Sequence, residues 1–156
     1  VLKGVAAVGL GRWLFGHLPA DAAVSPYLGV YLAAILAVVG HSKPIYFGFK
    51  GGKGVLVAAG AILAVQPVLL PVLAVIFLVC LVPTGMVSLG SITMAAAYPV
   101  LTLVYGLMRG LPTRDVVVCT VGAAIMGGMV IWMHRSNIQR IRDGKEYRFG
   151  QKHKRS

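Results

Sequence analysis

Residues 116–133 read VVVCTVGAAIMGGMVIWM, a run of 18 residues without a charged side chain. As an α-helix this run rises about 27 Å, close to the thickness of the hydrocarbon core of a bilayer. An uncharged apolar run of this length is typical of a membrane span. Residues 116–133 therefore predict a membrane-spanning helix.

Five further apolar segments repeat the pattern along the chain, at residues 4–18, 22–39, 55–65, 67–82 and 86–108. Hydrophobic residues make up 58% of the 156 residues and charged residues only 12%. This leaves too little polar surface to cover a soluble domain of this size. The sequence predicts an all-α, polytopic integral membrane helix bundle with about six transmembrane helices.

The segment at 55–65 is short, about 16 Å as a helix, so it is either a short span or a re-entrant segment. Six crossings place 12 of the 15 Lys and Arg residues on one side, the distribution expected when that side is cytoplasmic. A re-entrant 55–65 would move Lys43, Lys50 and Lys53 to the other side. We therefore expect six crossings, a transmembrane domain at 1–134 and a basic cytoplasmic tail at 135–156.

The charges and cysteines exclude several classes of protein. The formal net charge of +11 lies outside the apolar segments, which favours anionic headgroups and anionic substrates over nucleic acid as partners. Cys80 and Cys119 fall inside apolar runs and indicate neither a disulfide nor a metal site. Two of the four carboxylates fall on the side opposite the tail, together with Gln66, and only Asp143 and Glu146 lie in the tail. We expect no metal and no cofactor.

The loop at residues 40–54 reads GHSKPIYFGFKGGKG and predicts an anion-binding site. Its glycines let several backbone N–H groups converge, and Lys53 stands just before the helix expected from Val55, whose N-terminus favours an anion. The loop is not a Walker A element, because Phe47 and Gly54 replace the required Gly and Ser or Thr. Alternatively, the glycines only permit a tight turn and the lysines anchor the chain at the membrane surface.

Two other polar segments fall on the same side, the connection at 83–91 with Ser88 and Ser91 and the segment that starts at His134. His134 and Asn137 share one face of a helix at a spacing of three residues, so both can reach one ligand. A histidine can act there as acid, base or hydrogen-bond donor to phosphate. For Arg135 the alternative role is an interfacial anchor, and for His41 a loop residue bonded to the backbone.

Three ordered motifs give the chain a resemblance to a known family. They are Phe49-Lys50-Gly51-Gly52-Lys53-Gly54-Val55 after Gly40-His41, then Ser88-Leu89-Gly90-Ser91-Ile92, then His134-Arg135-x-Asn137-Ile138-x-Arg140 with Gly144 and Glu146. The set, which extends over nearly the whole chain, resembles the bacterial acyl-phosphate glycerol-3-phosphate acyltransferases. The resemblance implies a multi-pass inner-membrane protein of phospholipid biosynthesis with seven helices. It also implies that this chain is N-terminally truncated, lacking one span and a Ser-Gly-Asn-rich loop, so we do not expect it to be active alone.

The reaction implied by the resemblance is acyl transfer from acyl phosphate to the 1-hydroxyl of glycerol 3-phosphate, giving lysophosphatidic acid and phosphate. The implied catalytic residues are Lys53, His134 and Asn137, and the implied phosphate- or substrate-binding residues are His41, Gly51, Gly52, Gly54, Ser88, Ser91 and Arg135. Either Ser88 or Ser91 is expected to contact phosphate. The chain departs from the family at Val57, where Thr is usual, and at Ser136, where Glu is common.

An acyl phosphate carries a good leaving group, so the site needs no covalent nucleophile and has to bring two anions together. The hydroxyl proton goes either to the leaving phosphate or to His134. A small anion channel or transporter and a lipid-binding surface module are the competing hypotheses, and product formation distinguishes them from the enzyme.

Overall fold

The computed structural model describes residues 1–17, 24–42 and 53–149. These residues form seven α-helices, which are α1 (Leu2–Phe15), α2 (Pro26–Ser42), α3 (Val55–Val65), α4 (Leu69–Thr84), α5 (Val87–Met108), α6 (Thr113–Met133) and α7 (Arg135–Arg142). The prediction of an all-helical bundle is confirmed, and the first six helices correspond to the six predicted apolar segments.

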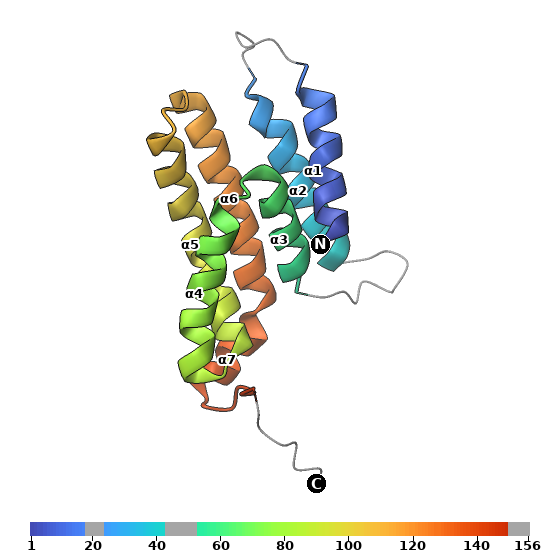
Figure 1. The fold of residues 1–156 in the computed structure, drawn as a ribbon. Helices are drawn as coiled ribbons and strands as arrows, with labels where there is room; N and C mark the ends of the chain where they lie inside the picture. Colours follow the sequence, from blue (N-terminus) through green and yellow to red (C-terminus); the bar gives the residue numbers. More distant parts are fainter. Residues whose placement is uncertain (18–23, 43–52, 150–156) are drawn as a thin grey trace.

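The helices run up and down the bundle (Figure 1). Helix α1 packs against α2 and α3, whereas α5 packs against α4 and α6, and the contact between α2 and α6 joins the two groups. The start of α3, the α4–α5 turn and the α6–α7 junction lie toward the same end, which we call the site end. The segments that the sequence placed on one side are therefore close in space.

Small residues let the helices approach closely, as is common where membrane helices pack. A Cβ atom on Gly4 would collide with the Val57 carbonyl oxygen of α3, and one on Gly127 would collide with the Ala95 carbonyl oxygen of α5. Glycine at these two positions therefore sets the contact distances of α1 with α3 and of α6 with α5.

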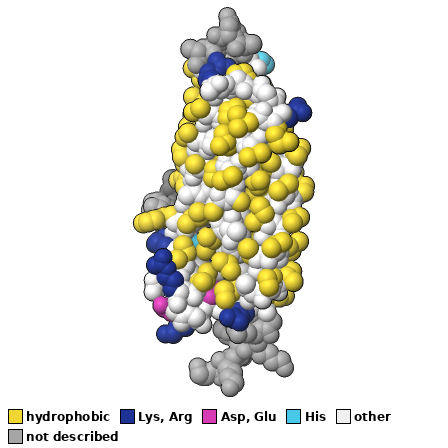
Figure 2. Space-filling model, turned by 90° about the vertical axis from the view of Figure 1, so that its left-hand side faces the viewer, with side chains coloured by type: hydrophobic (Ala, Val, Ile, Leu, Met, Phe, Trp, Pro, Cys, Tyr) yellow, Lys and Arg dark blue, Asp and Glu magenta, His cyan; other side chains and the backbone are white. Residues whose placement is uncertain are grey.

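The outer surface is strongly apolar. Helices α5 and α6 are long and apolar enough to cross a membrane, and α2, α3 and α4 are shorter apolar helices. Large apolar side chains such as Leu107, Val117 and Trp132 are more than half exposed. On the face shown in Figure 2, hydrophobic side chains cover the middle of the molecule and Lys and Arg lie toward its ends. Such a surface is suited to lipid.

Helix α6 begins three residues before the predicted segment, at Thr113. Its first turn contains Arg114 and Asp115, and the predicted segment left them out because they are charged. Pro112 at the N-cap and the acidic side chain of Asp115 nevertheless favour a helix start there.

Helix α7 follows α6 directly and packs against the ends of α5 and α6. The amide of Phe149 donates a 2.6 Å hydrogen bond to the carbonyl of Gly85. The described part of the basic tail is thus attached to the bundle.

The sequence placed Gln66 in a loop of the opposite face. Gln66 does lie in the connection between α3 and α4, but this connection is not at the opposite end of the bundle. Helix α3 has only 11 residues, so the α3–α4 connection lies well short of the α5–α6 turn (Figure 1). Gln66 is buried there, and its Oε1 accepts hydrogen bonds from the hydroxyl groups of Tyr31 at 3.4 Å and Thr102 at 3.2 Å. A polar cluster thus holds the connection inside the bundle.

Candidate active site

A cavity of about 630 Å³ lies at the site end, between the start of α3, the α4–α5 turn and the α6–α7 junction. It brings together five of the predicted site residues, which are Lys53, Ser88, Ser91, His134 and Asn137. Its apolar lining includes Leu56, Phe77 and Val87. A site with both linings suits a ligand that has a charged head and an apolar chain.

The start of α3 forms one wall. Gly54 is the N-cap of α3 and has a φ of +74°, a conformation that residues with a side chain rarely adopt. A Cβ atom there would also lie 3.1 Å from Cγ1 of Val38. The turn at Gly54 therefore places Lys53 beside the unpaired N–H groups of the first turn of α3, an arrangement that favours an anion.

His134 lies at the junction of α6 and α7, and its ring is held in one orientation. Its Nδ1 lies 2.7 Å from the carbonyl oxygen of Val130. Because a carbonyl oxygen only accepts, Nδ1 carries a proton, and in the neutral ring Nε2 has a free lone pair. Burial lowers the pKa of His134, the charge of Lys53 lowers it further, and the net shift is downward despite the opposing effects of Val130 and Glu146. The ring is therefore neutral at pH 7 and able to accept a proton.

Glu146 is the centre of a hydrogen-bond network at the floor of the cavity. Its Oε1 accepts 2.6 Å hydrogen bonds from Ser88 Oγ and from Asn137 Nδ2, and its Oε2 accepts one of 2.9 Å from Arg140 Nε. Burial alone would raise the pKa of Glu146, but these three donors lower it below its ordinary value. The carboxylate is ionised at neutral pH and connects α5 to α7.

Asn137 has one polar atom left for a ligand. Its Nδ2 donates to the Glu146 carboxylate, which fixes the orientation of the amide. Its Oδ1 is buried and has no hydrogen-bond partner among the described residues. A buried carbonyl oxygen without a partner is costly, so it is suited to accept a hydrogen bond from a substrate hydroxyl.

The two serines differ in their partners. Ser88 donates its hydroxyl hydrogen to Glu146, whereas Ser91 donates its hydrogen to the carbonyl oxygen of Val87 at 2.9 Å. In this structure both hydroxyl groups are therefore oriented as acceptors toward any further ligand. Ser91 can turn toward a phosphate at the cost of one backbone bond, and Ser88 only by releasing Glu146.

Two other predicted positions, His41 and Arg135, do not line the cavity. His41 is at the end of α2 and is not among the described residues that line the cavity. Arg135 points away from the cavity: its guanidinium lies 5.4 Å from the centroid of the Trp132 ring and donates to the Trp132 carbonyl at 3.3 Å. This geometry is that of an interfacial anchor. Gly51 and Gly52 lie outside the described residues.

Arg140 and Glu146 are not among the predicted site residues, although both occur in the sequence motifs. Asn137 and Arg140 are three residues apart on α7 and share a face. After α7 the chain reverses at Gly144, whose φ is +67°, and this reversal returns Glu146 to that face. The sequence feature that could have indicated a role for Glu146 is the glycine after a short helix, followed closely by a carboxylate.

The described part of the chain contains no group of three His, Cys, Asp or Glu residues arranged to hold a metal.

Comparisons with known proteins bear on the family of this chain. Residues 1–144 match the family model described as glycerol-3-phosphate acyltransferase. The glycerol-3-phosphate acyltransferase of Syntrophomonas wolfei subsp. wolfei is 38% identical over 146 residues, which cover 94% of this chain and 66% of the relative. That of Synechococcus elongatus is 39% identical over 152 residues, which cover 97% and 68%. The chain thus spans about two thirds of the length of these relatives.

Two crystal structures of PlsY (YgiH), described as an integral membrane glycerol 3-phosphate acyltransferase, have a similar fold. The lysophosphatidic acid form has a TM-score of 0.73 and 29% identity, and the match covers 96% of this chain and 69% of that one. The glycerol 3-phosphate form has a TM-score of 0.71 and 28% identity, over 96% and 68%. The resemblance seen in the sequence motifs is confirmed, and this integral membrane protein belongs to the glycerol-3-phosphate acyltransferase family.

Proposed function

We propose that the full-length protein transfers the acyl group of an acyl phosphate to the 1-hydroxyl of glycerol 3-phosphate, giving lysophosphatidic acid and phosphate. One observation carries the proposal: a single cavity contains Lys53, the neutral imidazole of His134 and the unpaired Oδ1 of Asn137. The related PlsY structures are described as glycerol 3-phosphate and lysophosphatidic acid forms, which supports these ligands for the same site.

Lys53 and the N-terminus of α3 bind phosphate oxygens in this scheme. Both reactants are anions, so a cation and free N–H groups are needed to hold them together. The same groups stabilise the negative charge that builds up on the departing phosphate. We assign phosphate binding to Lys53 because, among the described lysines, it is the one that lines the cavity.

His134 and Asn137 orient the glycerol phosphate. The Oδ1 of Asn137 accepts a hydrogen bond from one substrate hydroxyl, while Nε2 of His134 accepts the proton of the attacking hydroxyl. The new ester bond forms as the bond between carbonyl carbon and phosphate oxygen breaks, and phosphate leaves with the electron pair. Alternatively, the proton passes directly to the leaving phosphate. The activity of a His134→Gln variant distinguishes the two routes, because only the first needs the imidazole.

We further propose six membrane crossings, with the site end in the cytoplasm of a bacterium and the protein in its inner membrane. The distribution of Lys and Arg supports this orientation. A membrane-impermeant thiol reagent should label Lys145→Cys only after the membrane is opened, and Arg109→Cys in intact spheroplasts. The opposite labelling pattern contradicts the proposed orientation.

The activity itself is tested with the purified full-length protein in detergent or in vesicles. Radiolabelled acyl phosphate should yield labelled lysophosphatidic acid only when glycerol 3-phosphate is present. Anion flux into vesicles without product would instead support a channel or transporter, and lipid binding without either would support a surface module.

A further inference from the structure

An apolar groove lies on the outer surface between α2 and α6. It consists of two hollows of about 220 Å³ each. Ile35 of α2 and Ile125 of α6 line the first hollow, and Val39 and Met129, four residues farther along the same helices, line the second. Because four residues are about one helical turn, the hollows form one groove that leads to the site end. Ile125 is 46% exposed, so the groove opens to the lipid around the protein.

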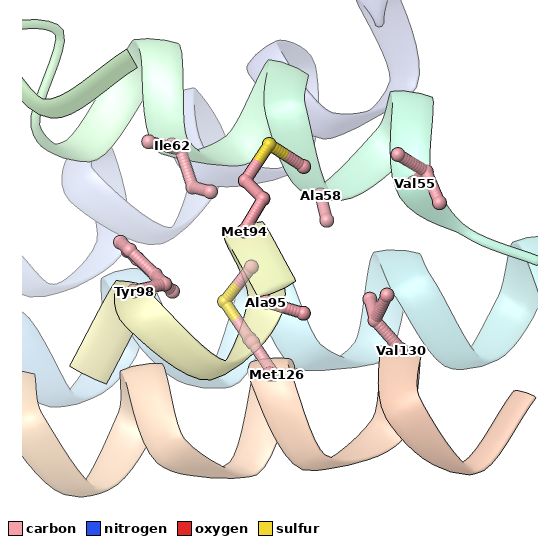
Figure 3. A pocket seen from close by; sticks show the side chains of 9 residues that line it. Val55, Ala58, Ile62, Met94, Ala95, Tyr98, Met126 and Val130 are labelled. Atoms are coloured by element: carbon pink, nitrogen blue, oxygen red, sulfur yellow. The ribbon is translucent and has the colours of Figure 1, made fainter. Parts of the chain in front are cut away.

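This groove is separate from the interior of the bundle. Met126 and Val130 of α6 line a pocket inside the bundle, together with residues of α3 and α5 (Figure 3). Ile125 and Met129 precede them by one residue each, which turns their side chains by about 100° around α6, toward α2. Among the described residues, none lines both the groove and the interior pocket or the proposed active site.

A cation lies at the site end of this groove. Trp132 lines the second hollow and is 69% exposed, and the guanidinium of Arg135 lies 5.4 Å from the centroid of its ring. Arg135 also donates to the Trp132 carbonyl, so both the indole ring and the backbone hold the guanidinium in place. Arg135 forms no ion pair with a described residue. The apolar groove therefore ends at a positioned cation that is open to an anion.

We propose that the groove binds one anionic phospholipid from the membrane leaflet at the site end, with its phosphate on Arg135 and an acyl chain in the hollows. A guanidinium suits a phosphodiester because it donates to two oxygens at once, and indole rings are typical at headgroup level. One leaflet contributes about 15 Å of hydrocarbon, half of the bilayer core. Between Trp132 and Ile125, α6 rises about 10 Å, so one chain reaches both hollows.

The groove also borders the turn that places Lys53. A Cβ atom on Gly54 would lie 3.4 Å from Oγ of Ser42 and 3.5 Å from Cε of Met133, and both of these residues line the second hollow. An acyl chain in this hollow packs on Met133 from the side opposite Gly54 and so supports the turn. Because the unfolded chain has no such groove, lipid binding stabilises the folded protein.

The headgroup contact is tested by native mass spectrometry of delipidated full-length protein, with phosphatidylglycerol and phosphatidylethanolamine as probes. We expect one phosphatidylglycerol to bind, more tightly than phosphatidylethanolamine. Arg135→Gln should weaken phosphatidylglycerol binding about tenfold. Lys145→Gln is the matched control, because Lys145 is exposed at the same end and its loss changes the net charge equally. Equal binding of the two lipids, or equal weakening by the two substitutions, overturns the inference.

The apolar contact is tested by filling the groove. Val39→Phe places a ring in the second hollow, whereas Leu36→Phe, the control, changes an exposed residue of α2 that lines neither hollow. Phosphatidylglycerol at ten times its Kd should raise the thermal unfolding midpoint of unsubstituted and Leu36→Phe protein by about 3–6 °C. The midpoint of Val39→Phe protein should rise much less.

An equal rise in Val39→Phe protein would show that the groove does not hold the acyl chain. A dimer that Val39→Phe converts to a monomer would show that a second copy of the chain occupies the groove, which also contradicts the inference. Arg135→Gln should leave the KM for glycerol 3-phosphate unchanged, and a raised KM would assign Arg135 to the substrate instead. The binding measurements need no turnover, so their outcome is independent of the proposed acyl transfer.

Discussion

The side-chain amide of Asn137 donates a 2.6 Å hydrogen bond to the Glu146 carboxylate, nine residues farther along the chain. The same carboxylate oxygen accepts a hydrogen bond from Ser88 at the start of α5. A single buried carboxylate therefore connects the motif at Ser88 to the motif that starts at His134, and it fixes the amide of Asn137 with its Oδ1 free for a ligand.

Glu146→Gln should destabilise the protein by about 1–3 kcal/mol, because it removes the charge that three donors stabilise. Thermal unfolding in detergent measures the effect. Asp143→Asn is the matched control, since Asp143 is exposed and its side chain accepts only from Gln139 among the described residues. Equal unfolding midpoints for the two variants would show that the Glu146 network does not hold α7 on α5.

The lowered pKa of Glu146 predicts an acid-dependent loss of stability. The unfolded chain binds a proton at this carboxyl near pH 4.5, whereas the folded protein does so only at lower pH. Glu146 therefore contributes its full stability above about pH 4.5 and loses it as pH falls through the folded pKa. Unfolding midpoints measured against pH should fall less steeply in this range for Glu146→Gln than for the unsubstituted protein.

The lowered pKa of His134 predicts the acidic limb of the pH profile of kcat/KM. A general base has to be neutral, and burial keeps His134 neutral below the ordinary pKa of 6.5. Activity should therefore persist as pH falls through 6.5 and decline only at lower pH. His134→Gln should lower kcat by about 100-fold or more and abolish the limb. A His134→Gln enzyme with most of its activity would indicate that the leaving phosphate takes the proton.

Gly54→Ala should raise the KM for the phosphate substrates and destabilise the protein by about 1–2 kcal/mol, because alanine resists a positive φ. Gly40→Ala is the control: Gly40 lies within α2, and an added Cβ there meets nothing within 4 Å. Alanine at that position should be neutral or stabilising. Similar effects of the two substitutions would show that the turn at Gly54 does not position Lys53.

The helices could be predicted from the sequence, whereas the side-chain network could not. Long uncharged runs report directly on burial in lipid, so α3 and α5 were located to within one residue. The burial of Gln66 depends on the length of α3 relative to its neighbours, which residue type alone does not show.

The site was predicted in part, for similar physical reasons. Lys53 and His134 lie at helix ends, and these helix ends come together at the site end of the bundle. Their side chains therefore line one cavity. The orientation of Arg135 depends on the turn between α6 and α7, which directs it to Trp132. The role of Glu146 depends on a chain reversal at Gly144 that apolarity does not encode.

The central claim is that Lys53 holds substrate phosphate in an acyltransferase site. The most direct measurement is the rate of labelled lysophosphatidic acid formation from acyl phosphate and glycerol 3-phosphate by full-length Lys53→Ala protein, beside Lys3→Ala. Lys3 is exposed on α1, so its removal changes the net charge equally without touching the cavity. We expect Lys53→Ala to lower kcat/KM by roughly 10- to 100-fold and Lys3→Ala to leave it unchanged. Normal turnover by folded Lys53→Ala protein would contradict the account.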